Sequence, residues 1–211
     1  VEFFKKTGVD ALAISYGTMH GASKGKDVKL RRQIPTAIRE CLNHEGIRGG
    51  LVSHGSSTVP KYIVDEINAL GGDIKNAYGI SLSELKEAIG CGINKINVDT
   101  DIRLAVTRNM KELFAGCPEL RESPSIGPVY RLLEENRDQF DPRVFLPPVM
   151  DTVMYGNVPD EDVARLMDCV ERGVKEAVGT LIVHFGAYGK APLVKQASLE
   201  EMKEFYKNAG K

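Results

Sequence analysis

The chain has 211 residues, of which 42% are apolar and 27% are charged, and its formal net charge is −1. This balance is typical of a globular protein, and the length fits one domain or the larger part of one. It excludes a strongly basic surface of the kind that binds nucleic acid or acidic membranes, and no apolar run approaches the roughly 18 residues of a membrane span. The four scattered cysteines, without a CxxC pair, indicate reduced thiols in a cytoplasmic protein.

The first half of the chain alternates short apolar segments with amphipathic ones. Residues 1–7 have the character of a helix already under way, so we expect the chain to be part of a longer protein. Residues 10–17 predict a strand that ends in glycine. A helix is expected next, and the proline inside its apolar pattern, Pro35, requires that it either begins near Ile34 or kinks there.

Two more strand–helix units follow. Residues 50–54 predict a second strand, and the next helix is expected to use Ser57 or Thr58 as its cap and Pro60 in its first turn. A short helix with a capping-box spacing from Ser81 precedes the third strand, residues 95–100. Strand–helix units in this order predict parallel strands with helical crossovers, in either an open sheet or part of a barrel.

From about residue 116 the prolines cluster, and we predict only helices from there to the end. The longest is expected over about residues 159–185, with an apolar stripe made of Val163, Met167, Val170, Val174, Val178 and Leu181. A short last helix is expected from Ser198. We therefore divide the chain into residues 1–115, which hold the strand–helix units, and residues 116–211, a helical extension of the same domain.

Polar residues cluster after each predicted strand, at positions 17–24, 54–57 and 97–101. The carboxyl ends of parallel strands share one edge of a sheet, where active sites are built, so we expect the three clusters to meet. His20 and His54 each precede a glycine there, and imidazole is a common zinc ligand. Two histidines are one ligand short of a catalytic zinc site, and each also fits an ordinary surface or hydrogen-bonded role. We assign that structural role to the other two histidines, His44 and His184.

The glycines and hydroxyls of the same clusters suit phosphate binding. The 55–57 run leads into a predicted helix N-terminus, where backbone N–H groups and the helix dipole favour an anion. Gly21 and Lys24 could add a close backbone approach and a positive charge. The 97–100 run could bind substrate hydroxyls or phosphate. Both runs also fit plain helix caps, and the residues alone leave these alternatives open.

Taken together, three motifs resemble those of class II fructose-bisphosphate aldolases. The family patterns GT-x-HG-x-x-K, HG-[GS]-S-x-VP and KINVDTD match, in order, residues 17–24, 54–60 and 95–101. Residues 71–80 resemble an insertion found in one subgroup, and Asp141-Pro142-Arg143 resembles a late DPR motif. The similarity extends from the first residue to about residue 150.

The resemblance implies an α/β fold of the TIM (β/α)8 barrel type, with this chain supplying roughly strands six to eight and the C-terminal helices. It implies a zinc ion, or another divalent ion such as cobalt, bound by His20 and His54, with a monovalent cation as a further possibility. It assigns the phosphorylated sugar to Gly21, Lys24, Gly55, Ser56, Ser57, Asn97, Asp99 and Thr100. Arg143 would meet the far phosphate, in this subunit's site or in that of a neighbour, because such enzymes are usually dimers or tetramers.

The implied reaction is the metal-dependent aldol cleavage of fructose 1,6-bisphosphate to dihydroxyacetone phosphate and glyceraldehyde 3-phosphate. The family's Asp-His pair, which supplies the acid/base and a third zinc ligand, is expected upstream of Val1, so this chain alone should be inactive. Two alternatives remain open. One is cleavage of tagatose bisphosphate, which differs at a single stereocentre, and the other is a non-catalytic phosphate-binding role if these residues are the whole product.

Overall fold

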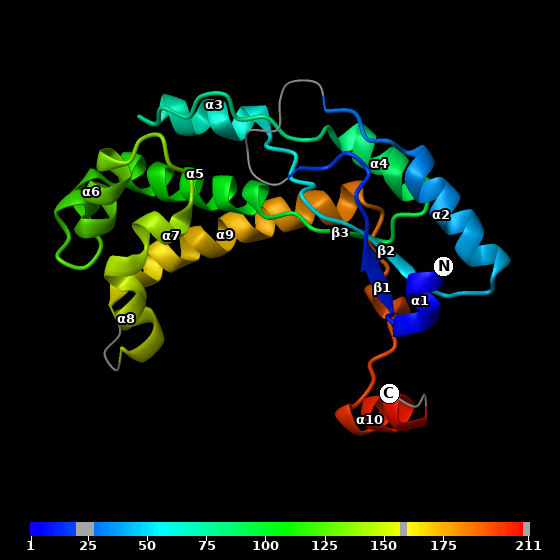
Figure 1. Ribbon diagram of the computed structural model, residues 1–211. Helices are drawn as coiled ribbons and strands as arrows, with labels where there is room; N and C mark the ends of the chain where they lie inside the picture. The colour runs from blue at the N-terminus through cyan, green and yellow to red at the C-terminus, as the bar shows by residue number, and fades with distance from the viewer. Residues whose placement is uncertain (20–27, 157–159, 209–211) are drawn as a thin grey trace.

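A computed structural model describes residues 1–19, 28–156 and 160–208 of the chain (Figure 1). The strands are β1 (Ala11–Ala13), β2 (Gly50–Ser53) and β3 (Lys95–Ile96). The helices of the first half are α1 (Glu2–Thr7), α2 (Gln33–His44), α3 (Lys61–Ala69), α4 (Leu82–Gly90) and α5 (Thr100–Gly116). The later helices are η1 (Pro118–Glu122), α6 (Gly127–Glu135), α7 (Pro142–Phe145), α8 (Pro147–Tyr155), α9 (Glu161–His184), η2 (Ala191–Leu193) and α10 (Leu199–Asn208).

The three strands form one parallel sheet in the order β1-β2-β3. The predicted α/β class and the predicted parallel direction are therefore confirmed. The strands are shorter than expected: β1 ends at Ala13 rather than at residue 17, and β3 has two residues. The reason for the short β3 is that Asp99 already serves as the N-cap residue of α5, so the chain turns away from the sheet. One further backbone hydrogen bond extends each strand pair beyond these bounds. Ile14 N donates to Val52 O, and Asn97 N donates to Ser53 O.

Helices α2 and α4 pack with the sheet around one apolar core. Leu42 of α2, Leu51 of β2 and Leu85 of α4 have no exposed surface and belong to the same cluster. Helix α2 begins at Gln33, which places its proline in the first turn, as one of the two expected alternatives required. On β1, by contrast, both alanines are exposed, so this strand forms an open edge of the sheet.

Helices α5 and α9 lie side by side along most of their length (Figure 1). Helix α9 spans Glu161–His184, close to the predicted extent, but its buried face coincides with the predicted stripe only in part, at Val163 and beside Met167 and Val170. Its buried residues are Val163, Leu166, Cys169, Gly173 and Ala177, whereas Val174 of the predicted stripe is 36% exposed. A Cβ atom added at Gly173 would lie 2.8 Å from both N and Cα of Val106. This close backbone approach fixes the rotation of α9, so its small residues Cys169, Gly173 and Ala177 are buried where Val174 is exposed.

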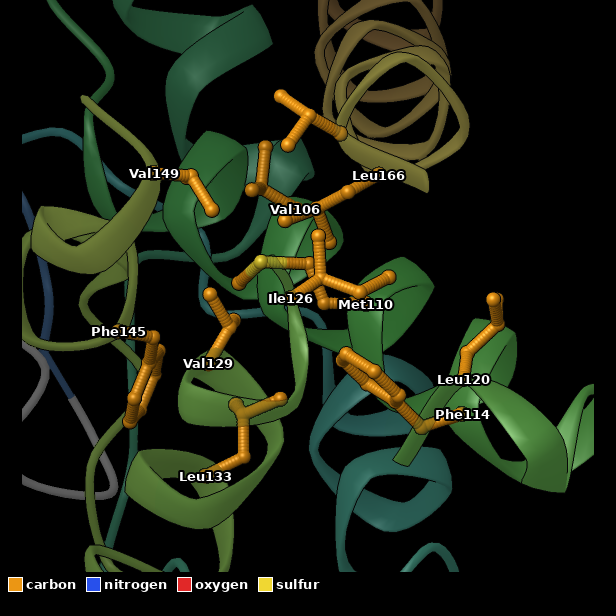
Figure 2. Close-up of a cluster of buried hydrophobic side chains, with 11 residues drawn as sticks. Val106, Met110, Phe114, Leu120, Ile126, Val129, Leu133, Phe145, Val149 and Leu166 are labelled. Atoms are coloured by element: carbon orange, nitrogen blue, oxygen red, sulfur yellow. The ribbon is translucent and has the colours of Figure 1, made fainter. Parts of the chain in front are cut away.

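From residue 117 onward the described residues contain helices and no strand, as expected. A second apolar core holds these helices to α5 (Figure 2). Its members are Val106, Met110, Phe114, Leu120, Ile126, Val129, Leu133, Phe145, Val149, Val163 and Leu166. The last helix, α10, has no buried residue and lies apart from the body of the molecule in Figure 1. Within the described ranges, none of the helices is both long enough and apolar enough to cross a membrane.

The helix starts differ in part from the expected caps. Ser81 caps α4, with its hydroxyl accepting from Glu84 N at 3.2 Å, but the Glu84 carboxylate accepts from Leu30 N at 3.0 Å instead of completing a capping box. Helix α3 begins at Lys61 with Pro60 as its N-cap residue, and no side chain caps it. The expected caps of α3, Ser57 and Thr58, are instead bonded to the start of α5.

Candidate functional site

The carboxyl ends of β2 and β3 lie side by side because the strands are parallel neighbours. His54 directly follows β2 and Asn97 directly follows β3. The side-chain amide nitrogen of Asn97 lies 3.2 Å from Nδ1 and 3.1 Å from Nε2 of the His54 ring. The fold therefore brings together two of the three polar clusters, with an exposed imidazole at their meeting point.

Ser57 joins the loop after β2 to the N-terminus of α5. Its hydroxyl oxygen accepts from the backbone N–H groups of Asp99, at 3.3 Å, and Thr100, at 3.1 Å. These N–H groups lack partners within the helix, so Ser57 caps α5 from a distant part of the chain. A hydroxyl has two acceptor lone pairs and one proton, so with two bonds accepted Ser57 can act toward any third group only as a donor.

Asp101 makes the reciprocal connection from α5 to the loop. The side chain is 3% exposed. One carboxylate oxygen accepts from Thr58 N at 3.0 Å and from Thr58 Oγ1 at 2.7 Å, and the other accepts from Val59 N at 2.8 Å. Val59 has a φ of 50°, a left-handed conformation that is strained for a branched residue and is held by these bonds. Asp101 is the last residue of the third motif, but the residue pattern alone gave no sign of this linking role.

The hydroxyl of Ser56 points into the protein. It lies 2.6 Å from the Ser53 hydroxyl, which in turn lies 2.5 Å from the Tyr16 hydroxyl, and all three residues are buried. Burial raises the pKa of Tyr16, while its bond to Ser53 acts in the opposite direction. The chain of hydroxyls ties the end of β2 to the segment after β1. Gly55, with a φ of 63°, makes the turn between His54 and this buried serine.

Four charged side chains form a ladder beside the loop. The Asp99 carboxylate is bound in a fork by Arg103, at 2.8 Å from Nε and 2.7 Å from the nearer Nη atom. Arg103 also bonds to Asp141, and Asp141 accepts from the Arg143 guanidinium at 2.6 Å. Arg143, whose side chain is 75% exposed, is thereby held on the same side of this chain as Asp99. The Arg143 guanidinium holds the pKa of Asp141 below its usual value, although partial burial opposes this.

The described residues do not hold a metal site by themselves. Among residues 1–19, 28–156 and 160–208, no three His, Cys, Asp or Glu side chains are grouped closely enough to bind an ion. The predicted ligand His20, with Gly21 and Lys24, lies outside the described residues. His54 fits a ligand role, because its imidazole is exposed at the end of a strand and lies beside Asn97.

The other two histidines each end a helix. His44 is exposed at the end of α2, and His184 ends α9, where it lines an apolar cavity with Tyr62 and Ile63. Neither is near another predicted ligand in the described structure. All four cysteines are free thiols, as expected.

The family to which this chain belongs follows from a match over most of its length. The family model described as "Fructose-bisphosphate aldolase class-II" matches residues 1–190. This chain is a class II fructose-bisphosphate aldolase family member. The resemblance of its three motifs is thereby confirmed, and the family match extends further along the chain than the motifs did. The family depends on a divalent metal ion, and the described residues of this member contribute one candidate imidazole ligand.

Relatives of this aldolase family member carry the same family name. Proteins named fructose-bisphosphate aldolase from Giardia intestinalis and Xanthobacter flavus are each 34% identical over 206 residues, covering 98% and 97% of this chain and 51% and 47% of the relatives. The one from Pseudomonas aeruginosa is 34% identical over 211 residues, covering 97% of this chain and 47% of that protein. The chain thus spans about half the length of the curated relatives that it matches.

Proposed function

We propose that this chain is the part of a class II fructose-bisphosphate aldolase that binds the metal through histidines and the triose portion of the sugar. The whole protein would cleave fructose 1,6-bisphosphate to dihydroxyacetone phosphate and glyceraldehyde 3-phosphate. The observation that carries the proposal is the meeting of His54 with Asn97 at the edge where Ser57 is bonded to Thr100. Relatives named fructose-bisphosphate aldolase favour this substrate over its tagatose isomer.

The proposed fold of the whole protein is a TIM barrel to which this chain contributes strands six to eight. Three parallel strands with helical crossovers and an open edge at β1 support this, because a barrel removes such edges by closing. Within one domain, residues 1–115 would form barrel units and residues 116–211 a helical extension. Support for a single domain comes from the core that Val106 and Phe114 of α5 share with the later helices.

In the proposed site, His20 and His54 hold a divalent ion, zinc or cobalt, which would polarise the ketose carbonyl as a Lewis acid when bound. The Asn97 side-chain amide lies against the His54 ring, with its nitrogen 3.1 Å from Nε2. A monovalent cation could accompany the divalent ion.

The sugar would be bound by the two loops that Ser57 and Asp101 join. Asp99, whose carboxylate is held by Arg103, is placed to accept a hydrogen bond from a hydroxyl of the sugar chain. The triose phosphate would rest against Gly55, Ser56 and Ser57 on one side and Asn97 and Thr100 on the other, with Gly21 and Lys24 completing its contacts. Ser56 would take part through its backbone, because its hydroxyl faces the interior.

Arg143 would bind the second phosphate. Its guanidinium is exposed and charged, and a fork of N–H donors suits a phosphate. The acid/base aspartate and the remaining metal ligand would come from an earlier strand. We propose a homodimer or tetramer in the cytoplasm as the working form.

The test is aldol cleavage by the full-length protein, measured with and without chelator. We expect activity to disappear on chelation and to return with Zn²⁺ or Co²⁺. We expect His54→Ala to lose about 100-fold or more, since even the loss of a residue supporting a metal ligand costs 10–100-fold. His44→Ala, at an exposed helix end, is the matched control and should retain full activity.

Turnover that resists chelation, with substrate trapped on a lysine by borohydride, would contradict the proposal. That result would indicate Schiff-base chemistry, for which Lys95 at the sheet edge is the candidate. Comparing kcat/KM for fructose and tagatose bisphosphates tests the substrate separately.

A further inference from the structure

A polar pocket of about 220 Å³ lies beside the C-terminal half of α5, between that helix and α6. Its lining residues are Leu70, Gly71, Lys111, Phe114, Ala115, Arg121, Tyr130, Leu133 and Glu134. Figure 2 labels two of them, Phe114 on α5 and Leu133 on α6. None of these residues belongs to the three motifs or to the proposed aldolase site.

Lys111 is the unusual member of this pocket, because it is charged and only 4% exposed. Its ammonium group lies 3.5 Å from the carbonyl oxygen of Leu133 and 3.9 Å from a carboxylate oxygen of Glu134. Both distances are long for hydrogen bonds, and an ammonium has three N–H donors. Buried charges are normally paired at close range, so Lys111 is poorly satisfied by its partners among the described residues.

The nearby charged side chains do not supply the close partner that the Lys111 ammonium group lacks. The Glu134 carboxylate is engaged by Arg137 at 2.7 Å, which leaves little of its charge for the lysine. Arg121 adds another cation to the lining, with its Nε donating to Phe114 O at 2.9 Å and its guanidinium 5.2 Å from the Tyr130 ring centre. The pocket lining thus carries two cations, Lys111 and Arg121, and one carboxylate that is already paired with Arg137. Burial lowers the pKa of Lys111 and Arg137 acts in the same direction, while Glu134 opposes them.

We propose that this pocket binds a small phosphate-bearing anion, with Lys111 as the buried counter-charge and Arg121 as a second donor. The pocket is smaller than the roughly 300 Å³ at which drug-sized sites begin, so it fits inorganic phosphate or a short phosphorylated metabolite. Lys111 lies about 16 Å along α5 from Thr100. The pocket therefore lies apart from the proposed aldolase site.

The experiment is a calorimetric titration of the full-length protein with inorganic phosphate at about pH 9, where phosphate is already a dianion. Wild type is compared with Lys111→Met, which keeps most of the side-chain length and removes the charge. Lys175→Met, an exposed lysine of α9 paired with Glu171, is the control. We expect Lys111→Met to weaken one phosphate-binding event by about tenfold or more, because bonds to charged groups are worth that much, and the control to bind as wild type.

Proton uptake gives a readout that a merely structural role would not produce. An anion favours the charged lysine and raises its pKa, so binding should draw protons from solution. Titrations in two buffers of different ionisation enthalpy measure this uptake, and an uptake that is larger in wild type than in Lys111→Met supports direct contact between Lys111 and the anion. If Lys111→Met does not fold, Arg121→Gln replaces it, and weaker phosphate binding is again expected.

Phosphate binding that is unaffected by both substitutions would overturn the proposal. A competition titration with glycerol 3-phosphate then distinguishes a phosphorylated metabolite from inorganic phosphate as the ligand. Competition with phosphate at the Lys111-dependent event supports a metabolite, and phosphate binding without such competition supports the inorganic ion. We expect His54→Ala to impair aldol cleavage and to leave phosphate binding at the Lys111 pocket intact. The aldolase proposal and the phosphate-pocket proposal can therefore be contradicted independently of each other.

Discussion

Two side chains, Ser57 and Asp101, connect the loops of the candidate site, and each comes from the loop opposite to its partners. Ser57 satisfies N–H groups at the start of α5, and Asp101 satisfies N–H groups of the loop before α3. Such exchange locks two loops that are far apart in sequence. The position of Asn97 beside His54 therefore depends in part on Asp101, which lies outside the proposed substrate contacts.

Asp101→Asn tests this connection. An amide keeps the shape but turns one acceptor into donors that face the N–H groups of Thr58 and Val59. We expect a loss of about 2 kcal/mol in the free energy of unfolding, measured by urea titration. Asp138→Asn, an exposed aspartate, should change it by less than about 0.5 kcal/mol. Equal stability of the two variants would contradict the role given to Asp101.

Asp141 predicts a specific acid dependence of stability. Because Arg143 lowers its pKa in the folded protein, its contribution is full above the ordinary aspartate value near pH 4 and is lost as the pH falls through the lowered folded value. Asp141→Asn should therefore destabilise the protein at pH 7, by roughly 1 kcal/mol for a largely surface pair. The difference should disappear near pH 2. Unfolding titrations of both proteins at the two pH values measure it, and a difference independent of pH would refute the ion pair. Asparagine also caps helices well, so the N-cap of α7 is preserved.

Helix α9 shows how far a pattern along one helix determines its packing. Its apolar periodicity predicts the helix and nearly its bounds, because that period reflects the geometry of the helix itself. The face that becomes buried is set by the partner. The backbone of α5 approaches α9 at Gly173, where any side chain would collide with Val106.

Gly173→Ala tests the close approach of α5 and α9. The added Cβ would lie 2.8 Å from backbone atoms of Val106 and 2.9 Å from the carbonyl carbon of Ala105, which can yield only if the helices move apart. We expect a loss of about 1–3 kcal/mol in thermal or urea unfolding. Gly179→Ala in the same helix meets nothing within 4 Å and should instead stabilise by up to about 1 kcal/mol through helix propensity. Two substitutions of the same sign would contradict the assignment.

As a whole, the described molecule has a small sheet with one edge uncovered and a last helix that stands apart from the body (Figure 1). An open parallel sheet leaves N–H and C=O groups available for pairing with another chain. The proposed acid/base and the remaining metal ligand are also outside this chain.

We therefore expect residues 1–211, expressed alone, to aggregate, to bind Zn²⁺ weakly and to lack aldolase activity. Size-exclusion chromatography, zinc titration and a cleavage assay measure these properties. A monodisperse chain that melts cooperatively and cleaves the substrate would refute this prediction.

The sequence by itself determined the family, the α/β class, the parallel strand–helix order and the helical second part. These follow from local periodicity and from motifs whose residue types suit metal and phosphate chemistry. Tertiary structure decided which partner each polar group found. Ser57 and Asp101 bond across more than 40 positions, Arg143 joins Asp99 through two intermediates, and α9 turns its small residues inward. Hydrogen bonds and close backbone contacts depend on the distance between atoms in space, and a pattern along the chain does not contain that distance.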